Sequence, residues 1–192
     1  MERSMAAKKS RSVVSLMLVT VVAVVVIASL GYAVLKDYEA TLYEYDVTGT
    51  HQYENLNGDI VTTDIWGDVS TTYMDILGET RVTTTSGISY HDADTNTDKI
   101  YELQKRWSFT SSPDYGSLTS SITGYSTSNF GQKDVDVYVH SDENAGEVIK
   151  RWVGQDDGVV YRVEMTISND GLTTVINQEL REYGPTMMPL DI

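Results

Sequence analysis

The sequence predicts an all-β ectodomain preceded by a single N-terminal transmembrane α-helix. Residues 13–35 form an uncharged, apolar run of 23 residues. From Thr41 onward, apolar and polar residues alternate with a period of two, the pattern of strands that bury one face. Turn signals that favour hairpins recur at short intervals, at Asn57-Gly58, Gly67-Asp68, Gly78-Glu79, Ser86-Gly87, Asp157-Gly158 and Asp170-Gly171. We therefore expect an antiparallel meander that closes into a barrel, a half-barrel or a sandwich.

The apolar run is long enough to cross a membrane. At about 1.5 Å per residue it spans roughly 34 Å, which matches the hydrocarbon core of a bilayer. Residues 1–12 carry four Lys/Arg against one Glu. The positive-inside rule therefore places residues 1–12 in the cytoplasm and the chain after Lys36 outside the plasma membrane. This organisation gives a juxtamembrane linker over 36–40, an extracytoplasmic β domain over 41–183 and a C-terminal tail over 184–192.

Two other interpretations use the same N-terminal residues. A cleaved signal peptide could end near Gly31 to Ala33, although the apolar run is longer than such peptides usually have. The order of basic leader, hydrophobic helix and β domain resembles that of archaeal type IV pilins and archaellins, a resemblance that covers residues 1–35. Those leaders usually end in a basic residue followed by Gly or Ala, whereas Arg11 is followed here by Ser12. The resemblance implies a pilin-like filament subunit.

The charge balance narrows the class of partner. After Lys36 the chain has nine Lys/Arg and 27 Asp/Glu, a net charge of −18. Such a domain is not expected to bind nucleic acid or to lie on an anionic membrane surface. It suits divalent cations and cationic or surface-layer partners, or a solvated acidic surface. The chain has no cysteine, which for an outward-facing domain of this size indicates a core large enough to fold without disulfides.

The β domain is expected to contain about ten strands. Their predicted ranges are 41–53, 59–66, 69–77, 79–86, 88–91, 99–109, 133–141, 146–154, 158–168 and 172–183. Residues 110–132 are rich in Ser, Thr and Gly without periodicity, so we expect a long loop there. Tyr115, Tyr125 and Phe130 give this loop aromatic side chains with which to contact a ligand or cover it.

One cluster has the spacing of metal ligands. Alternate oxygen-bearing side chains over seven residues match the first half of an EF-hand loop and predict a weak Ca²⁺ site formed by Asp92, Asp94, Asn96 and Asp98. Thr97 stands where such loops carry Gly, and Leu103 stands where they carry the bidentate Glu. A polar hairpin turn explains the same residues, because Asp and Asn are common in turns.

A Lys-Arg-Trp triplet occurs twice, at 105–107 and at 150–152. On a strand, Lys105 shares a face with Trp107, and Lys150 shares a face with Trp152. If that face is the interior of the sheet, the two pairs could line a cavity for a lipid or a small apolar ligand. Alternatively, the lysines lie at the rim of the sheet with their ammonium groups in water.

No catalytic motif is present, and the three histidines are far apart in sequence. We therefore expect a protein that is not an enzyme: a membrane-anchored extracytoplasmic β-sheet domain with a binding or structural role at a prokaryotic cell surface. A tethered carrier of a lipid or small apolar ligand, built as a half-barrel, is the alternative, and a pilin-like filament subunit is the third. A cavity of several hundred Å³ would favour the carrier.

Overall fold

The computed structural model describes residues 37–76, 79–110 and 114–189, which form nine strands and no helix. The strands are β1 (Asp37–Glu54), β2 (Ile60–Ile76), β3 (Glu79–Asp92), β4 (Thr97–Thr110), β5 (Ser117–Thr127), β6 (Gly131–Asp142), β7 (Glu147–Gly154), β8 (Val160–Asn169) and β9 (Leu172–Pro189). The predicted membrane span, residues 13–35, lies outside the described residues. Within them, no helix has the length and apolar character needed to cross a membrane.

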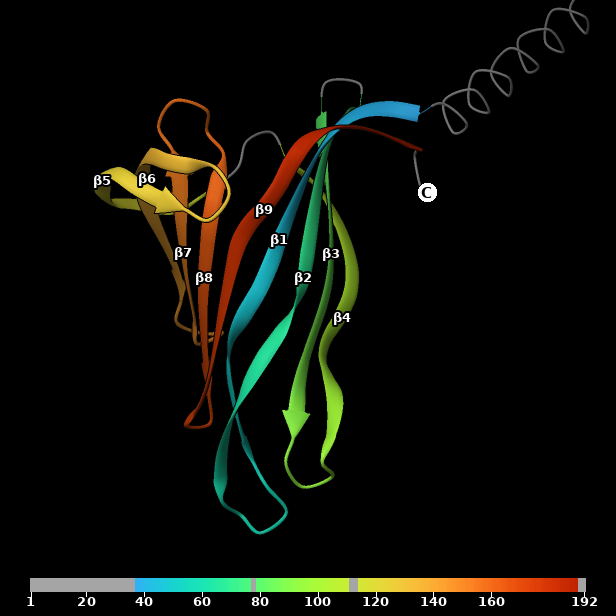
Figure 1. Ribbon diagram of the computed structural model, residues 1–192, viewed down its shortest axis with the longest axis vertical. Helices are drawn as coiled ribbons and strands as arrows, with labels where there is room; N and C mark the ends of the chain where they lie inside the picture. Colours follow the sequence, from blue (N-terminus) through green and yellow to red (C-terminus); the bar gives the residue numbers. More distant parts are fainter. Residues whose placement is uncertain (1–36, 77–78, 111–113, 190–192) are drawn as a thin grey trace, which may run out of the picture. The chain divides into compact units, whose positions relative to one another are not determined.

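The nine strands form one open antiparallel sheet in the order β4-β3-β2-β1-β9-β8-β7-β6-β5. It consists of two meanders, β1 to β4 and β5 to β9, joined where β1 pairs with β9 in the middle of the sheet (Figure 1). Side-chain contacts fix the direction of that central pair. Glu44 near the start of β1 binds Arg181 of β9, and His51 near the end of β1 contacts Thr174 of β9. The residue numbers rise along one strand and fall along the other, so the pair is antiparallel. The all-β antiparallel prediction is confirmed, whereas a closed barrel is excluded.

The length of the connection between the two edge strands requires the sheet to curl. β4 ends at Thr110 and β5 begins at Ser117, at opposite edges of the sheet. Seven Cα steps span at most about 25 Å, whereas nine flat strands would be roughly 38 Å wide. The two edges must therefore approach each other at this end. Consistent with this, residues from β2, β3 and β4 line the same cavity as residues from β7, β8 and β9.

The core lies between the two meanders and follows the predicted alternation. In β1, Tyr45 and Val47 are buried while Asp46 and Thr48 are exposed. The same alternation along the other strands gives one cluster of buried residues, formed by Tyr45, Val47, Ile65, Val69, Ile88, Val135, Val159, Tyr161, Ile176 and Leu180. Burial of these side chains from both meanders is what holds the curled sheet together.

Two glycines that we interpreted as turns lie inside strands instead. The predicted strands 59–66 and 69–77 form the single strand β2, and 79–86 and 88–91 form the single strand β3. A Cβ on Gly67 would lie 2.9 Å from the carbonyl carbon of Gly87 on the neighbouring strand. Gly67 therefore allows two backbones to approach closely. Because glycine can mark a close approach of two strands as well as a turn, the sheet has fewer and longer strands than predicted.

The predictions for residues 110–132 and for the C-terminal tail are also corrected. Residues 117–127 form β5, an edge strand in which every side chain from Ser117 to Gly124 is exposed. Because this strand buries neither face there, it carries no period-two signal. β9 continues to Pro189 rather than ending near residue 183. Its pairing with β8 ends at Glu179, so the prolines beyond that point interrupt no ladder with β8.

Candidate functional site

A groove between the two meanders has a volume of about 610 Å³. One wall comes from β2, β3 and β4, and consists of Val69, Val82, Thr84, Ser86, Ile88, Glu102, Gln104, Arg106 and Ser108. The other comes from β7, β8, β9 and the turn before β7, and consists of Ala145, Glu147, Met165, Ile167, Ile176 and Gln178. The groove is a direct consequence of the curl, since each meander supplies one wall.

Apolar and polar residues occupy different parts of the groove. Val69, Ile88 and Ile176 are almost completely buried, so they lie furthest from solvent and form an apolar floor. Four of the eight polar lining residues, Glu102, Gln104, Arg106 and Ser108, come from the edge strand β4 and are partly or fully exposed, whereas Ser86 on β3 is buried. Such a site matches a ligand with an apolar body and a polar end.

The polar wall carries both charges. Glu102 and Arg106 stand four residues apart on β4 and therefore share its groove face. The hydroxyl of Ser86 donates a hydrogen bond to Glu102 Oε1 at 2.5 Å, which fixes the position of the carboxylate. Glu147 lies on the opposite wall. The groove thus offers hydrogen-bond acceptors on both walls and a guanidinium donor on one.

Lys105, Lys150 and Trp152 do not line this groove. On β4 the groove face is formed by even-numbered residues, so Lys105 lies on the opposite face, next to Leu103, which is 72% exposed. Trp107 belongs to the same strand, and its side chain is outside the described part of the structure. On β7, Lys150 Nζ binds Glu164 at 2.9 Å, and the guanidinium of Arg162 stacks on Trp152 at 4.9 Å.

The three aromatic residues predicted for a loop pack against other parts of the sheet. Tyr125 lies 6.5 Å from Trp152, ring centre to ring centre. Phe130 contacts Tyr161 at 5.7 Å and Tyr183 at 5.4 Å. Tyr115 lines a second, smaller cavity described below. Of the predicted ligand-binding residues with described side chains, none lines the groove.

This second cavity has a volume of about 150 Å³ and is lined by Tyr43, Tyr45, Tyr73, Tyr115, Gly158 and Val160. The Tyr45 hydroxyl donates a hydrogen bond to the carbonyl of Val160 at 3.1 Å. Burial raises the pKa of Tyr45, and it also raises the pKa of Tyr73. Both phenols are protonated at neutral pH, and that of Tyr45 donates the hydrogen bond to Val160. The small size and the internal hydrogen bond indicate a packing feature of the core.

The predicted calcium loop is tied together by its own contacts. Asp92 is buried, accepts hydrogen bonds from the backbone N–H of Asp94 and of Thr95, and forms an ion pair with Lys99. The bond to Lys99 lowers the pKa of Asp92. Asp94 accepts from the backbone N–H of Leu56 at 3.1 Å. In the described ranges, no group of three or more His, Asp or Glu side chains is placed to hold a metal ion. The calcium site stays a prediction.

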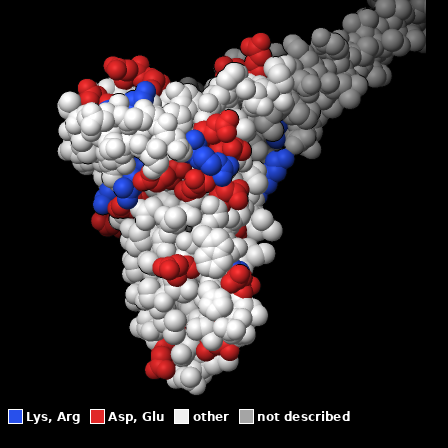
Figure 2. Space-filling view, viewed as in Figure 1, with Lys and Arg blue, Asp and Glu red and all other residues white. Residues whose placement is uncertain are grey.

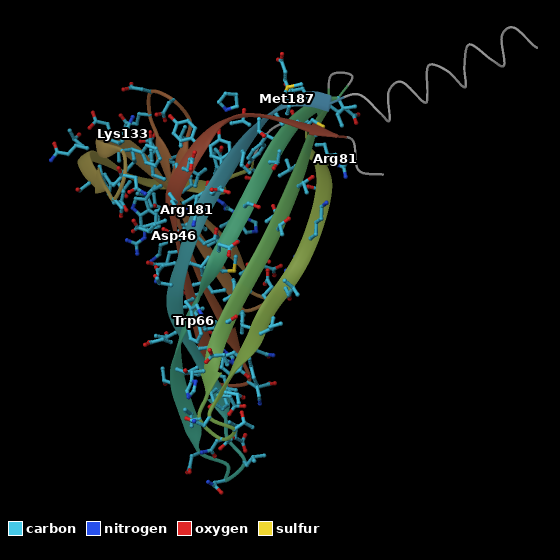
Figure 3. The ribbon with its side chains drawn as sticks, turned by 45° about the vertical axis from the view of Figure 1, so that its right-hand side comes forward. Asp46, Trp66, Arg81, Lys133, Arg181 and Met187 are labelled. Carbon is cyan, nitrogen blue, oxygen red and sulfur yellow. The ribbon has the colours of Figure 1, made fainter. Side chains whose placement is uncertain are left out.

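The acidic surface is partly neutralised by local ion pairs. Arg181 on β9 binds Asp46 at 2.9 Å and Glu44 at 3.0 Å, both on β1. Figure 3 shows Arg181 and Asp46 side by side on the two central strands. In the space-filling view, basic side chains gather beside acidic ones over this region, and acidic residues stand alone elsewhere on the same face (Figure 2). These pairs strengthen the β1–β9 junction on the face opposite the groove.

Sequence reasoning missed the groove residues of β4 because it considered a cavity only on the odd-numbered face, that of Lys105 and Trp107. The available signal was the run of polar residues at alternate positions, Glu102, Gln104, Arg106 and Ser108. Alternation alone marks two faces without saying which one turns inward. No protein-family model matches the chain, and no curated protein is significantly similar to it.

Proposed function

We propose that this protein is a membrane-tethered binding protein that holds a small amphipathic ligand, such as a lipid, in the groove between its two meanders. The observation that carries the proposal is the groove itself. Its volume of about 610 Å³ falls within the usual range of small-molecule sites, roughly 300–1,000 Å³. A scaffold or adhesin domain would have no need for a cavity of this size between its core layers.

The lining supports a ligand with two chemically different parts. Acyl or other apolar groups would contact the floor formed by Val69, Ile88 and Ile176, where burial removes them from water. A polar head would lie against Glu102 and Arg106 near the edge strand, where hydrogen bonds to charged groups are available. Residues 13–35, which lie outside the described part, supply the proposed membrane tether, and the acidic domain would face the outside.

Two neighbouring threonines on β3 allow a matched test. Thr84 lines the groove, whereas Thr85 is exposed on the opposite face of the same strand. We expect Thr84→Trp to reduce binding at least about tenfold, because the indole would occupy part of the groove, and Thr85→Trp to leave binding unchanged. The measurements are native mass spectrometry of the full chain as purified in detergent, and titration with a fluorescent fatty acid. Equal binding by the two variants, or no bound ligand in any of the proteins, would contradict the proposal.

A further inference from the structure

The two edge strands of the open sheet, β4 and β5, differ in how easily another strand could pair with them. β5 pairs with β6 through two register shifts, at Leu118/Ser120 and at Ile122/Tyr125. Gly124, between them, has a φ of 68°. Bulges of this kind distort an edge and protect it from further pairing. β4 pairs with β3 through a single register shift, between Ile100 and Glu102, and without any shift from Glu102 to Thr110. The other edge of β4 has no neighbouring strand in the described sheet.

Apolar residues on the exposed face of β4 also favour pairing with another strand. Leu103 is 72% exposed and Ile100 is 64% exposed. An edge strand that is regular over nine residues and has exposed apolar side chains presents unpaired backbone N–H and C=O groups together with apolar surface. Natural proteins usually cover such an edge.

The sequence of β4 is complementary to itself. When two identical strands pair antiparallel around a two-fold axis, one residue lies opposite its own copy, and the neighbours on each side pair reciprocally. If Gln104 is that central residue, Glu102 lies opposite Arg106 of the second copy, and Arg106 lies opposite Glu102. Directly opposite side chains have Cβ atoms about 4.5–5.5 Å apart, and pairs of opposite charge stabilise the sheet.

Neighbouring registers lack this complementarity. Centring the axis on Glu102, Lys105 or Arg106 places each of these charges opposite itself, which is unfavourable. Centring it on Leu103 pairs Glu102 with Gln104 and Arg106 with Ile100, so neither charge meets its opposite. We therefore propose that two copies of this chain associate through antiparallel pairing of β4 with β4, centred on Gln104. The proposal does not depend on the groove having a ligand.

The orientation of Glu102 is compatible with this pairing. Its Oε1 atom already accepts a hydrogen bond from Ser86 within the same copy, and the second oxygen can accept from an arginine across the interface. Arg106 is exposed, so its guanidinium can reach across the edge. The pairing would join two nine-stranded sheets and bring the β4 walls of their two grooves together.

The chain has no natural cysteine, so a single introduced thiol can report the contact. Gln104→Cys would place two thiols opposite each other at the axis. Ser108→Cys, on the same strand and the same face, would place them about 27 Å apart, because each is four residues from the axis. We expect a short bis-maleimide to link the full-length Gln104→Cys protein into dimers and to leave Ser108→Cys monomeric. Equal linking of both variants, or of neither, would overturn the proposal.

A charge exchange tests the register. In the Gln104→Cys protein, Glu102→Arg places two arginines opposite each other, and Arg106→Glu does the same with two carboxylates. We expect each single change to lower the linked fraction at least about fivefold, and the double change Glu102→Arg/Arg106→Glu to restore it. Thermal unfolding of each variant verifies that the fold is retained. A double variant that links no better than the single variants would refute the pairing.

Discussion

Gly49 and Gly87 offer a direct test of the strand packing, since both lie inside strands but an added Cβ would meet another backbone only at Gly49. A Cβ on Gly49 would lie 2.9 Å from the carbonyl carbon of Val175 on β9, and closer still to its oxygen. Both neighbours are backbone atoms, so β1 and β9 would have to separate. A Cβ on Gly87 would meet no atom within 4 Å. Alanine should therefore destabilise the protein at Gly49 but not at Gly87.

We expect Gly49→Ala to lower the free energy of unfolding by about 2–4 kcal/mol, at or above the usual cost of overpacking. Gly87→Ala should be neutral or raise it by about 0.5 kcal/mol, because alanine reduces the entropy of the unfolded chain. For a domain of this size, about 2–4 °C per kcal/mol gives a melting temperature lower by roughly 5–15 °C for Gly49→Ala. Thermal unfolding of the full chain, followed by circular dichroism, measures both variants. If Gly49→Ala melts within about 2 °C of Gly87→Ala, the close approach of β1 and β9 does not exist as described.

Two further predictions concern titrating and cation-binding groups. The ring Nδ1 of His51 lies 2.9 Å from the Thr174 hydroxyl, and burial lowers the pKa of this histidine. Below about pH 6.5 the imidazole is therefore protonated more readily in the unfolded chain than in the folded protein, so the free energy of unfolding falls as the pH decreases. Between about pH 8 and pH 5, wild type should thus lose more melting temperature than His51→Gln, and equal losses in the two proteins would show that this ring does not contribute. At the hairpin between β3 and β4, the ammonium group of Lys99 forms an ion pair with the Asp92 carboxylate and so competes with a cation for it. If the loop is a weak calcium site, calcium at about 10 mM should raise the melting temperature of Lys99→Gln more than that of wild type. No shift in either protein would leave the loop as a hydrogen-bonded turn.

The sequence by itself determined the local features of the fold. Alternation marked Tyr45 and Val47 as a buried face because side chains on a strand point to opposite sides at every step. Turn glycines identified hairpins where the backbone truly reverses: Gly58 and Gly171 have φ angles of 85° and 82°, a conformation that glycine adopts without strain. Each of these features depends on a few neighbouring residues, so a single sequence contains the information.

Only the tertiary structure decided the features that depend on distant strands. Gly67 resembles a turn residue in sequence but lies within β2, because the backbone that requires its missing side chain belongs to β3. β5 shows no strand pattern, because an exposed edge strand has no buried face to encode. The groove face of β4 is the polar one, and the curl of nine strands determines which face that is. Alternation shows which residues share a side of a strand, and the position of the strand in the curled sheet decides whether that side meets the core, the groove or solvent.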